Sequence, residues 1–318
     1  MGASTAHGWI QNNMPAITRS NPYTSGLVIE NPAMTVEYIL RSFFGLDYTK
    51  IDTDSFDTVG TSTSGMKLAA SIQTQKSGIE HINRILFEFN LQLFLTTTGK
   101  YKIVNMGSGS GNATSTISNS DIFMDLNGPL ITVSKSSVLG IYNNIYLNYR
   151  QDYSRGTDIY QGYKYIGVID EGVSASTNMS SSTGALRNTT YHGWMQQSRD
   201  VYRTGKNLEL NLEFVRDNTT ADIVLKRFAD YYAFRRMIVT ATLLKMETAM
   251  KLELGDLVKF NNRLLGTLHA NIADFMITRI NYAPVNVEGI PVIQIEAQEV
   301  PFSRTGDTVD NSAVPVEQ

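Results

Sequence analysis

The sequence contains no cysteine, and this absence removes several kinds of chemistry at once. A chain of 318 residues without cysteine has no disulfide, no thiolate nucleophile and no sulfur ligand for a metal ion. Its stability must therefore come from side-chain packing or from assembly with other chains.

Positive charge is also in short supply. The chain has 27 Lys and Arg residues against 30 Asp and Glu residues, which gives a net charge of -3. Sequence-independent binding of nucleic acid depends on clustered Lys and Arg. Arg235 and Arg236, beside Phe234, form too small a basic patch for this purpose. Nucleic-acid binding is therefore not the favoured function.

Long apolar runs are missing as well. No run approaches the roughly 20 apolar residues that a membrane-spanning helix requires. The segment from Met1 to Trp9 has neither the basic region nor the apolar region of a secretion signal. We therefore expect a soluble chain with no membrane segment and no secretion signal.

Histidine, the usual proton carrier near neutral pH, occurs only four times. None of the four has another histidine at metal-ligand spacing, and the sequence has no Gly-x-Ser-x-Gly motif. These residues are His7, His81, His192 and His269. We expect structural or solvent-exposed roles for them, and no catalytic residue, cofactor site or metal site. Paired carboxylates brought together from distant positions stay possible from sequence alone.

Four aspartates near the start, Asp47, Asp52, Asp54 and Asp57, raise the question of a calcium loop. Counted from Asp52, the template requires Gly where Asp57 stands and Glu where Thr63 stands. We interpret these aspartates as caps of a short turn before Phe56. The glycine-rich stretch 107–112 likewise lacks the third glycine and the following helix of a dinucleotide loop, and it favours a flexible connector.

The first third of the chain predicts a small α+β module over residues 31–106. Asn31 caps a first amphipathic helix that has Pro32 at its first position and Gly45 after its end. Ser77 and Glu80 form a capping box for a second helix. A β-hairpin follows, with strands over residues 91–95 and 101–106 and a turn over residues 97–100. Residues 1–30 are predicted to be an N-terminal arm, and residues 107–120 a flexible linker.

The remainder predicts a β-rich domain over residues 121–300. Alternating apolar residues indicate strands around 144–149, 208–214, 237–244, 257–258, 275–282 and 292–297, and a single helix is indicated over Asp217 to Tyr232. One helix among five or six strands favours a β-barrel or a tightly bent sheet that carries a helix. Residues 173–190 are predicted to be a mobile loop, and residues 301–318 a polar tail.

A series of tyrosines within this domain is the strongest candidate for a contact surface. Tyrosine is enriched at subunit interfaces, can form a platform for sugars, and is also favoured in strands by propensity alone. Of these readings, subunit contact stands ahead of sugar binding. The subunit-contact candidates are Tyr146, Tyr153, Tyr160, Tyr163 and Tyr165.

Several motifs, taken in order, resemble the central hub proteins at the tip of bacteriophage tails. They begin with Asn31 to Arg41, the segment Asp-Thr-Asp-Ser-Phe-Asp at 52–57, and Gly99 to Ile103 after a helix and a hairpin. They continue with the segments 148–153, 212–217 and 252–260, the last of which reads Leu-Glu-Leu-Gly-Asp-Leu-Val-Lys-Phe. The order of the motifs carries the resemblance, which covers residues 28 to 300.

The resemblance implies a structural role and no enzymatic one. Hub proteins of this family are homotrimers that cap the tail tube, convert its six-fold ring to three-fold symmetry and surround the channel through which DNA leaves. Their barrel domains are related to tail-tube proteins. The implied partners are further copies of the chain, a tail-tube or distal tail protein, the tape-measure protein, other hub, fibre or spike subunits, and the exiting DNA in transient contact. The implied location is the tail tip of the virion, after assembly in the host cytoplasm.

The sequence departs from the family pattern at its start, where longer hubs already have a complete domain. The resemblance therefore implies either a hub split between two polypeptides, with the usual N-terminal domain lacking here, or a missing portion supplied by a neighbour. Two other functions stay open at this point. One is a tail-associated hydrolase of peptidoglycan or glycan, and the other is a glycan-binding module that uses the tyrosine-rich section.

Overall fold

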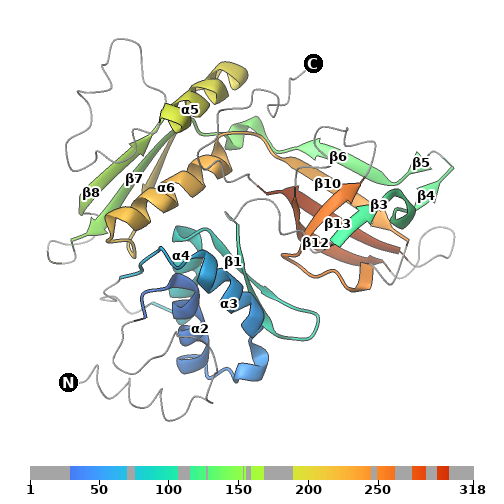
Figure 1. The fold of residues 1–318 in the computed structure, drawn as a ribbon, viewed down its shortest axis with the longest axis horizontal. Helices are drawn as coiled ribbons and strands as arrows, with labels where there is room; N and C mark the ends of the chain where they lie inside the picture. The colour runs from blue at the N-terminus through green and yellow to red at the C-terminus, as the bar shows by residue number, and fades with distance from the viewer. Residues whose placement is uncertain are drawn as a thin grey trace.

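The structure is a computed structural model, and its α+β fold is shown in Figure 1. It describes residues 29–69, 76–106, 115–126, 128–152, 154, 159–167, 189–244, 249–261, 274–283 and 292–300. A helix-plus-hairpin module precedes a curled, barrel-like sheet, as the sequence predicts. The predicted N-terminal arm up to residue 28, the predicted tail 301–318, and His7 and His269 lie outside the described residues.

The N-terminal module begins as its caps predict. Its elements are α2 (Pro32–Ser42), α3 (Thr53–Ser62), α4 (Gly78–Glu88), β1 (Leu91–Leu95) and β2 (Tyr101–Asn105). The Asn31 side chain accepts hydrogen bonds from the first backbone N–H groups of α2, and both bonds of the Ser77–Glu80 capping box are present. Gly99 has a φ of 75°, which lets the β1–β2 hairpin turn tightly.

Helix α3 corrects the prediction for the aspartate cluster. The sequence predicts a short turn before Phe56, whereas residues Thr53–Ser62 form a helix. Its Ser, Thr and Gly residues are poor helix formers, so the helix signal is weak. The fully buried Phe56 and the buried Val59 anchor it against the core. Packing therefore decides the conformation here, and local propensity does not.

A three-stranded sheet with two helices forms the middle of the chain. The elements are β7 (Asn144–Gln151), β8 (Tyr160–Ile166), α5 (Thr189–Tyr202), β9 (Asn207–Asn211) and α6 (Asn218–Tyr232). The strand order is β8-β7-β9, with β8 antiparallel and β9 parallel to β7. Asp217 caps α6, as predicted, by accepting from the Thr220 backbone N–H at 2.8 Å. Helix α6 lies along one side of this sheet (Figure 1).

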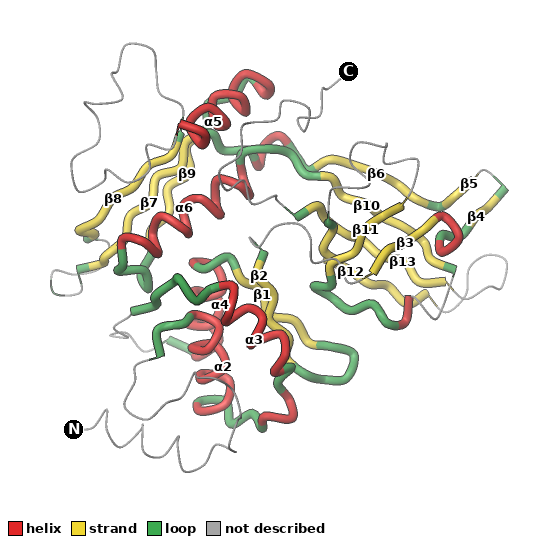
Figure 2. Tube along the Cα trace, in the orientation of Figure 1, coloured by secondary structure: helices red, strands yellow, loops and turns green. Residues whose placement is uncertain are grey.

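A six-stranded sheet forms the other part of the molecule. Its order is β3-β11-β12-β13-β10-β6, formed by β3 (Ser115–Ser118), β11 (Leu257–Asn261), β12 (Phe275–Ala283), β13 (Val292–Glu299), β10 (Met237–Leu243) and β6 (Ile131–Lys135). The sheet curls, so that β3 and β11 pass in front of β12 and β13 in Figure 2. A separate apolar core, which includes Phe260, Phe275 and Ile295, fills its concave side. A small hairpin of β4 (Met124–Asp125) and β5 (Gly128–Pro129) projects beside β6.

Three details of the predicted organisation need correction. Residues 115–118, at the end of the predicted flexible linker, form strand β3 and pair in parallel with β11. Helix α5 is a second helix in the β-rich part of the chain, whereas the sequence predicts a single helix there, over Asp217 to Tyr232. Residues 173–188 of the predicted mobile loop lie outside the described residues. Residues 189 and 190, the last two of the predicted loop, are the first two residues of α5. The weak amphipathic pattern of α5 explains why sequence reasoning missed it.

One apolar core joins the N-terminal module to the three-stranded sheet. Residues from α2, α3 and α4 share a continuous buried cluster with residues from β7, β8, β9 and α6. The rings of Phe87 and Phe228 lie 5.7 Å apart across this junction, and the Lys67 backbone N–H donates to the Thr220 hydroxyl at 2.9 Å. The predicted domain bounds stay a prediction, but the apolar core crosses them.

The β1–β2 hairpin also reaches the six-stranded sheet. The Lys102 ammonium group on β2 lies 2.5 Å from the Asp256 carboxylate and 3.7 Å from the Glu253 carboxylate. Both acidic residues lie in the turn that leads into β11. Gly255 in this turn has a φ of 82°, and a Cβ placed there would lie 2.7 Å from the Val104 side chain. The motif 252–260 therefore packs against the β1–β2 hairpin as well as forming the start of β11.

Candidate interaction surfaces

Three of the five predicted tyrosines lie together on the outer face of the three-stranded sheet. Tyr146 on β7 lies directly opposite Tyr165 on β8, and their ring centroids are 4.8 Å apart. The ring of Tyr163 lies 6.2 Å from that of Tyr146, and 44% of Tyr163 is exposed. These three side chains form what we call the tyrosine face.

Of the other two tyrosines, Tyr160 has the opposite orientation in the structure. Side chains alternate along a strand, so Tyr160 has the same orientation as Lys164 and Ile166, which are buried on the side of α6. Tyr153 lies outside the described residues. That the tyrosines contact another subunit stays a prediction.

A row of polar side chains continues the tyrosine face across β7 and β9. Asn144 donates to Asn207 at 3.0 Å and accepts from the Tyr165 hydroxyl at 3.0 Å. Asn148 donates to Glu209 and Asn211, at 2.9 and 2.8 Å. Such cross-strand pairs hold the face in one conformation. Because its side chains are aromatic or neutral amides for the most part, the face suits a contact that combines ring packing with hydrogen bonds.

Partial burial affects the ionisation of this face. Loss of solvent, with Tyr146 and Glu209 nearby, raises the pKa of the Tyr163 hydroxyl to about 12. The hydroxyl group therefore keeps its proton throughout the physiological pH range and is available there as a neutral donor.

The inner face of the same sheet is fixed to α6 by a buried ion pair. The Lys164 ammonium, which is almost fully buried, contacts the Asp222 carboxylate on α6. Next to it, the Tyr149 hydroxyl donates to the Asn218 side chain at 2.8 Å. Gly162 on β8 leaves room for the Tyr149 ring, since a Cβ there would lie 2.6 Å from it. These contacts hold the sheet in place and thereby position the tyrosine face.

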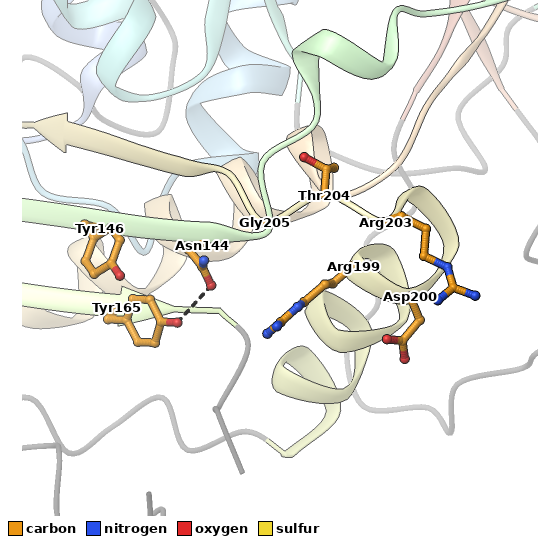
Figure 3. A pocket seen from close by; sticks show the side chains of 8 residues that line it. All are labelled: Asn144, Tyr146, Tyr165, Arg199, Asp200, Arg203, Thr204 and Gly205. Carbon is orange, nitrogen blue, oxygen red and sulfur yellow. Dashed lines mark hydrogen bonds between the residues drawn. The ribbon is translucent and has the colours of Figure 1, made fainter. Parts of the chain in front are cut away.

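A cleft opens where the tyrosine face meets α5 (Figure 3). It has a volume of about 560 Å³, and its walls include Asn144, Tyr146, Tyr165, Arg199, Asp200 and Arg203. Arg199 and Arg203 lie one helical turn apart at the end of α5, where the Arg203 backbone N–H donates to the Arg199 carbonyl. Sequence reasoning missed this cleft because the two arginines and the tyrosines come from elements that only the fold brings together.

A second surface follows the open edge of the six-stranded sheet. Strand β6 pairs with β10, and no strand covers its other side in the part of the chain that the structure describes. Four of its five residues are exposed. Exposed apolar side chains lie on this strand and in the segments directly before and after it in the chain, namely Met124, Leu126, Leu130, Val133, Val138 and Leu139. We call this set the β6 rim.

The opposite end of the same sheet is open as well. Strand β3 pairs with β11 and has no other strand beside it among the described residues. Unpaired edges expose backbone N–H and C=O groups that can pair with another chain. Within the described ranges, β3 and β6 are thus the two edge strands of this sheet.

A buried carboxylate joins α4 to the loop after β9. The Glu88 side chain is fully buried and accepts from the backbone N–H groups of Glu213 and Phe214, at 2.7 and 2.8 Å. Arg84 donates to the same carboxylate at 2.8 Å. Burial raises the pKa of Glu88 to about 7, although Arg84 and the two N–H groups act in the opposite direction. These contacts give Glu88 a structural role, in which its side chain connects α4 to the loop after β9.

Other predicted candidates show local structural roles. Asp47 caps a short 3-10 turn by accepting from the Thr49 backbone N–H at 2.8 Å, and this bond lowers the pKa of its carboxyl group. The ring of His81 on α4 lies 6.5 Å from that of Phe214. His192 falls within α5, in a turn whose side chains lie outside the described set. No three His, Asp or Glu residues within the described ranges gather in a way that could hold a metal ion.

Each helix in the described ranges is too short or too polar to span a membrane. Taken together, these features define an α+β protein with an open, curled six-stranded sheet and a second sheet that carries a tyrosine face.

Comparisons with known proteins give a loose likeness to phage tail and related particle proteins. No protein-family model matches the chain, and no curated protein matches it. A protein of the virion of a native gene transfer agent particle matches with a TM-score of 0.47 and 13% identity, over 100% of this chain and 59% of that one. The 43 kDa tail protein of prophage MuSo2 from Shewanella oneidensis matches with a TM-score of 0.42 and 12% identity, over 83% of this chain and 65% of that one.

Prophage tail protein gp18 from Listeria monocytogenes matches with a TM-score of 0.38 and 10% identity, over 82% of this chain and 64% of that one. The chain thus spans less than two thirds of the length of these proteins. At these TM-scores and identities the likeness does not assign the chain to their family or give it their function.

Proposed function

We propose that this protein is a structural component of a phage tail, and that it serves in the tip or baseplate hub. In this role it caps the tail tube as a homotrimer and surrounds the channel through which DNA leaves. Its partners are further copies of itself, a tail-tube or distal tail protein, the tape-measure protein and other hub, fibre or spike subunits. The order of sequence motifs from Asn31 to Phe260 supports this proposal.

The observation that carries the proposal is the open six-stranded sheet. An exposed edge with apolar side chains is an aggregation hazard in a free monomer, and proteins cover such edges or pair them. Here the β6 rim has the fully exposed Leu126 at the tip of its neighbouring hairpin and Val133 on the edge strand itself. A second chain that pairs with β6 satisfies its backbone groups and covers these side chains.

The two ends of the sheet suggest how copies of the chain associate. If β6 of one copy pairs with β3 of the next, each copy uses two different surfaces, and such a head-to-tail contact closes into a ring when the rotation permits. A homotrimer of this kind continues the curled sheet around a central space. This arrangement suits a channel in the centre of a tail tip.

The absence of cysteine makes this pairing directly testable by disulfide cross-linking. Thr116 on β3 and Ser134 on β6 are exposed residues of the two edges, and an introduced pair forms a disulfide only when their Cα atoms come within about 7 Å. We expect oxidation of Thr116→Cys/Ser134→Cys, or of the register-shifted pair Thr116→Cys/Thr132→Cys, to give covalent dimers and trimers.

The matched control keeps Thr116→Cys and moves the second cysteine to Val201 on α5, which is similarly exposed but far along the chain from the edge strand. Cross-linking that is equally efficient in Thr116→Cys/Val201→Cys, or absent in both edge pairs, contradicts the pairing. Finding the protein by cryo-microscopy at the tail tip of a virion tests its location separately.

The hydrolase alternative finds less support at the cleft. A glycosidase needs two carboxyl groups that face the bond to be cleaved. Among the residues that line the cleft, Asp200 is the one carboxylate. The structural role is therefore the proposal that the described residues support better than hydrolysis at this cleft.

A further inference from the structure

We propose that the outer face of the three-stranded sheet binds a neutral saccharide at a site formed by Tyr146, Tyr163, Asn148, Glu209 and Asn211. The inference goes beyond assembly and does not rest on it, because this site and the β6 rim belong to different sheets. A second subunit packed on the same rings would exclude such a ligand. The saccharide site and the predicted subunit contact of these tyrosines are therefore alternatives.

The register of the three strands brings the five side chains together. Tyr163 on β8 lies opposite Asn148 on β7, which lies beside Asn211 on β9. In the neighbouring row, Tyr146 on β7 lies beside Glu209 on β9. Strands in a sheet are about 4.8 Å apart and same-face residues of one strand about 7 Å apart, so the site is about 10 Å wide and about 7 Å long. A short oligosaccharide fits such an area.

The rings of Tyr146 and Tyr163 supply a surface on which a sugar can stack. Their centroids are 6.2 Å apart and their planes are tilted by 32°, and 44% of Tyr163 is exposed. In the described part of the chain, neither hydroxyl group has a hydrogen-bond partner. The C–H groups of a sugar can therefore pack on the rings while its hydroxyl groups bond to polar atoms beside them.

Polar groups beside the rings match the hydroxyl groups of a sugar. The Asn148 amide donates to one carboxylate oxygen of Glu209 at 2.9 Å and to the Asn211 side-chain oxygen at 2.8 Å. These bonds hold Glu209 and Asn211 in place, and both residues are exposed. The second Glu209 oxygen is an acceptor and the Asn211 amide nitrogen is a donor. Adjacent hydroxyl groups, which both donate and accept, can bond to this pair.

The make-up of the face favours a saccharide over an apolar protein surface. No Val, Ile, Leu or Met occupies an outward position of β7, β8 or β9. The buried centre of a protein interface is apolar and poor in carboxylates, and covering Glu209 with apolar atoms would cost free energy. Glu209 is the one ionised side chain of the five, and its negative charge repels an anionic ligand. A neutral saccharide meets both conditions.

The neighbouring cleft gives a longer saccharide room to extend. Its volume is about 560 Å³, and Tyr146 and Tyr165 form part of its wall (Figure 3). Because Tyr146 belongs to both the cleft and the stacking surface, a second or third sugar unit can continue from the rings into the cleft. The stacking surface itself uses no charge from the cleft.

The experiment measures the binding of neutral trisaccharides to the full chain by isothermal titration calorimetry. The probes are maltotriose, cellotriose and triacetylchitotriose, which differ in linkage and in substituents. We expect saturable binding of at least one probe and weaker binding of trigalacturonate, an anionic trisaccharide. Tyr163→Ala should weaken the binding about tenfold, because the stacking surface is lost. The control Tyr282→Ala removes a similarly exposed tyrosine from β12 and should leave binding unchanged.

A second variant tests the polar part of the site and does not depend on the folding of Tyr163→Ala. Glu209→Gln leaves both rings in place and should weaken binding of the neutral probe about fivefold, because a charged acceptor is lost. The proposal is overturned if none of the three neutral probes binds saturably, or if Tyr163→Ala and Glu209→Gln both bind as the parent does. Tighter binding of trigalacturonate than of every neutral probe overturns it as well.

Light scattering on the same variants separates a saccharide site from a subunit contact. The saccharide site predicts that Tyr163→Ala keeps the mass of the parent species and loses binding. A lower mass for Tyr163→Ala would overturn the proposal in favour of a subunit contact through the rings. Val133→Lys, which alters the β6 rim, should bind the neutral probe as the parent chain does. Failure of the assembly proposal and failure of saccharide binding can thus be told apart.

Discussion

At the scale of single residues, Glu88 links the stability of the fold to pH. Its fully buried carboxylate accepts from two backbone N–H groups of a segment more than a hundred residues later in the chain. A buried carboxylate with a raised pKa holds its proton more tightly in the folded chain than in the unfolded one. The sequence places Glu88 at the end of a helix and gives no sign of its partners.

We predict that stability falls as pH rises through the range that Glu88 titrates. Below its unfolded pKa of about 4.5 both states hold the proton, and between that value and about 7 only the folded state does. The contribution of Glu88 therefore decreases by up to about 3 kcal/mol over this window and is constant above it. Urea denaturation at pH 5 and pH 7.5 measures the change.

The variant Glu88→Gln should lose this part of the pH dependence, because its side chain does not titrate. It should also be less stable than the parent at pH 5 by about 1–3 kcal/mol, since an amide cannot accept at both positions. The control Glu213→Gln, a partly exposed neighbour of the same Arg84, should keep the parental pH dependence. An unchanged pH dependence in Glu88→Gln would show that another group causes it.

Gly255 gives a second prediction at this scale. Gly255→Ala introduces a Cβ at a φ of 82° and places it 2.7 Å from the Val104 side chain and 2.9 Å from that of Phe94. Backbone strain and this overlap should lower the free energy of unfolding by about 1–3 kcal/mol. Gly140→Ala, at a position with open space and no positive φ, should change it by less than about 0.5 kcal/mol. Equal effects in the two variants would contradict a role for Gly255 in the close contact between its turn and the β1–β2 hairpin.

At the scale of elements, strong local signals predicted structure well and weak ones did not. The first helix after Asn31, the helix after Ser77, the β1–β2 hairpin and α6 have clear caps, turns or periodicity, and all are present. Strands β7, β9, β10, β12 and β13 follow the predicted alternation of apolar residues. Helices α3 and α5 and strand β3 lack such signals, because contacts distant in sequence determine their conformation.

The candidate site was predicted only in part for a similar reason. A series of tyrosines is visible in the sequence, but which of them share a face depends on the register of β7 against β8. The register places Tyr146 beside Tyr165 and assigns Tyr160 to the opposite orientation. The arginines of the cleft lie in α5 or directly after its last residue, and the sequence shows no helix signal in this segment.

The contact of β8 with α6 gives a prediction about elements. Asp222→Asn removes the charge partner of the buried Lys164 ammonium and should lower the free energy of unfolding by about 3–5 kcal/mol, measured by urea denaturation at pH 7. Glu30→Gln breaks the exposed Lys67–Glu30 pair and should cost less than about 1 kcal/mol. A cost below about 1 kcal/mol for Asp222→Asn would mean that the ion pair does not fix the sheet to the helix.

At the scale of the whole molecule, the shared core predicts that the N-terminal module does not fold alone. Residues 29–106 without residues 189–244 lose the partners of α4 and expose buried side chains such as Phe89 and Leu86. We expect this fragment to show no cooperative thermal transition by circular dichroism, whereas the full chain should show one. A sigmoidal transition in the isolated fragment would instead support an independent domain over residues 31–106.

Assembly is the central claim at this scale, and the mass of the purified chain in solution tests it most directly. By size-exclusion chromatography with light scattering, we predict a species of three times the 35.3 kDa chain mass. Val133→Lys, which places a charge on the β6 rim, should shift the mass toward one chain, while Val201→Lys on α5 should not. A parent chain that stays at 35.3 kDa at every concentration, or a trimer that Val133→Lys leaves intact, would contradict assembly through the open sheet.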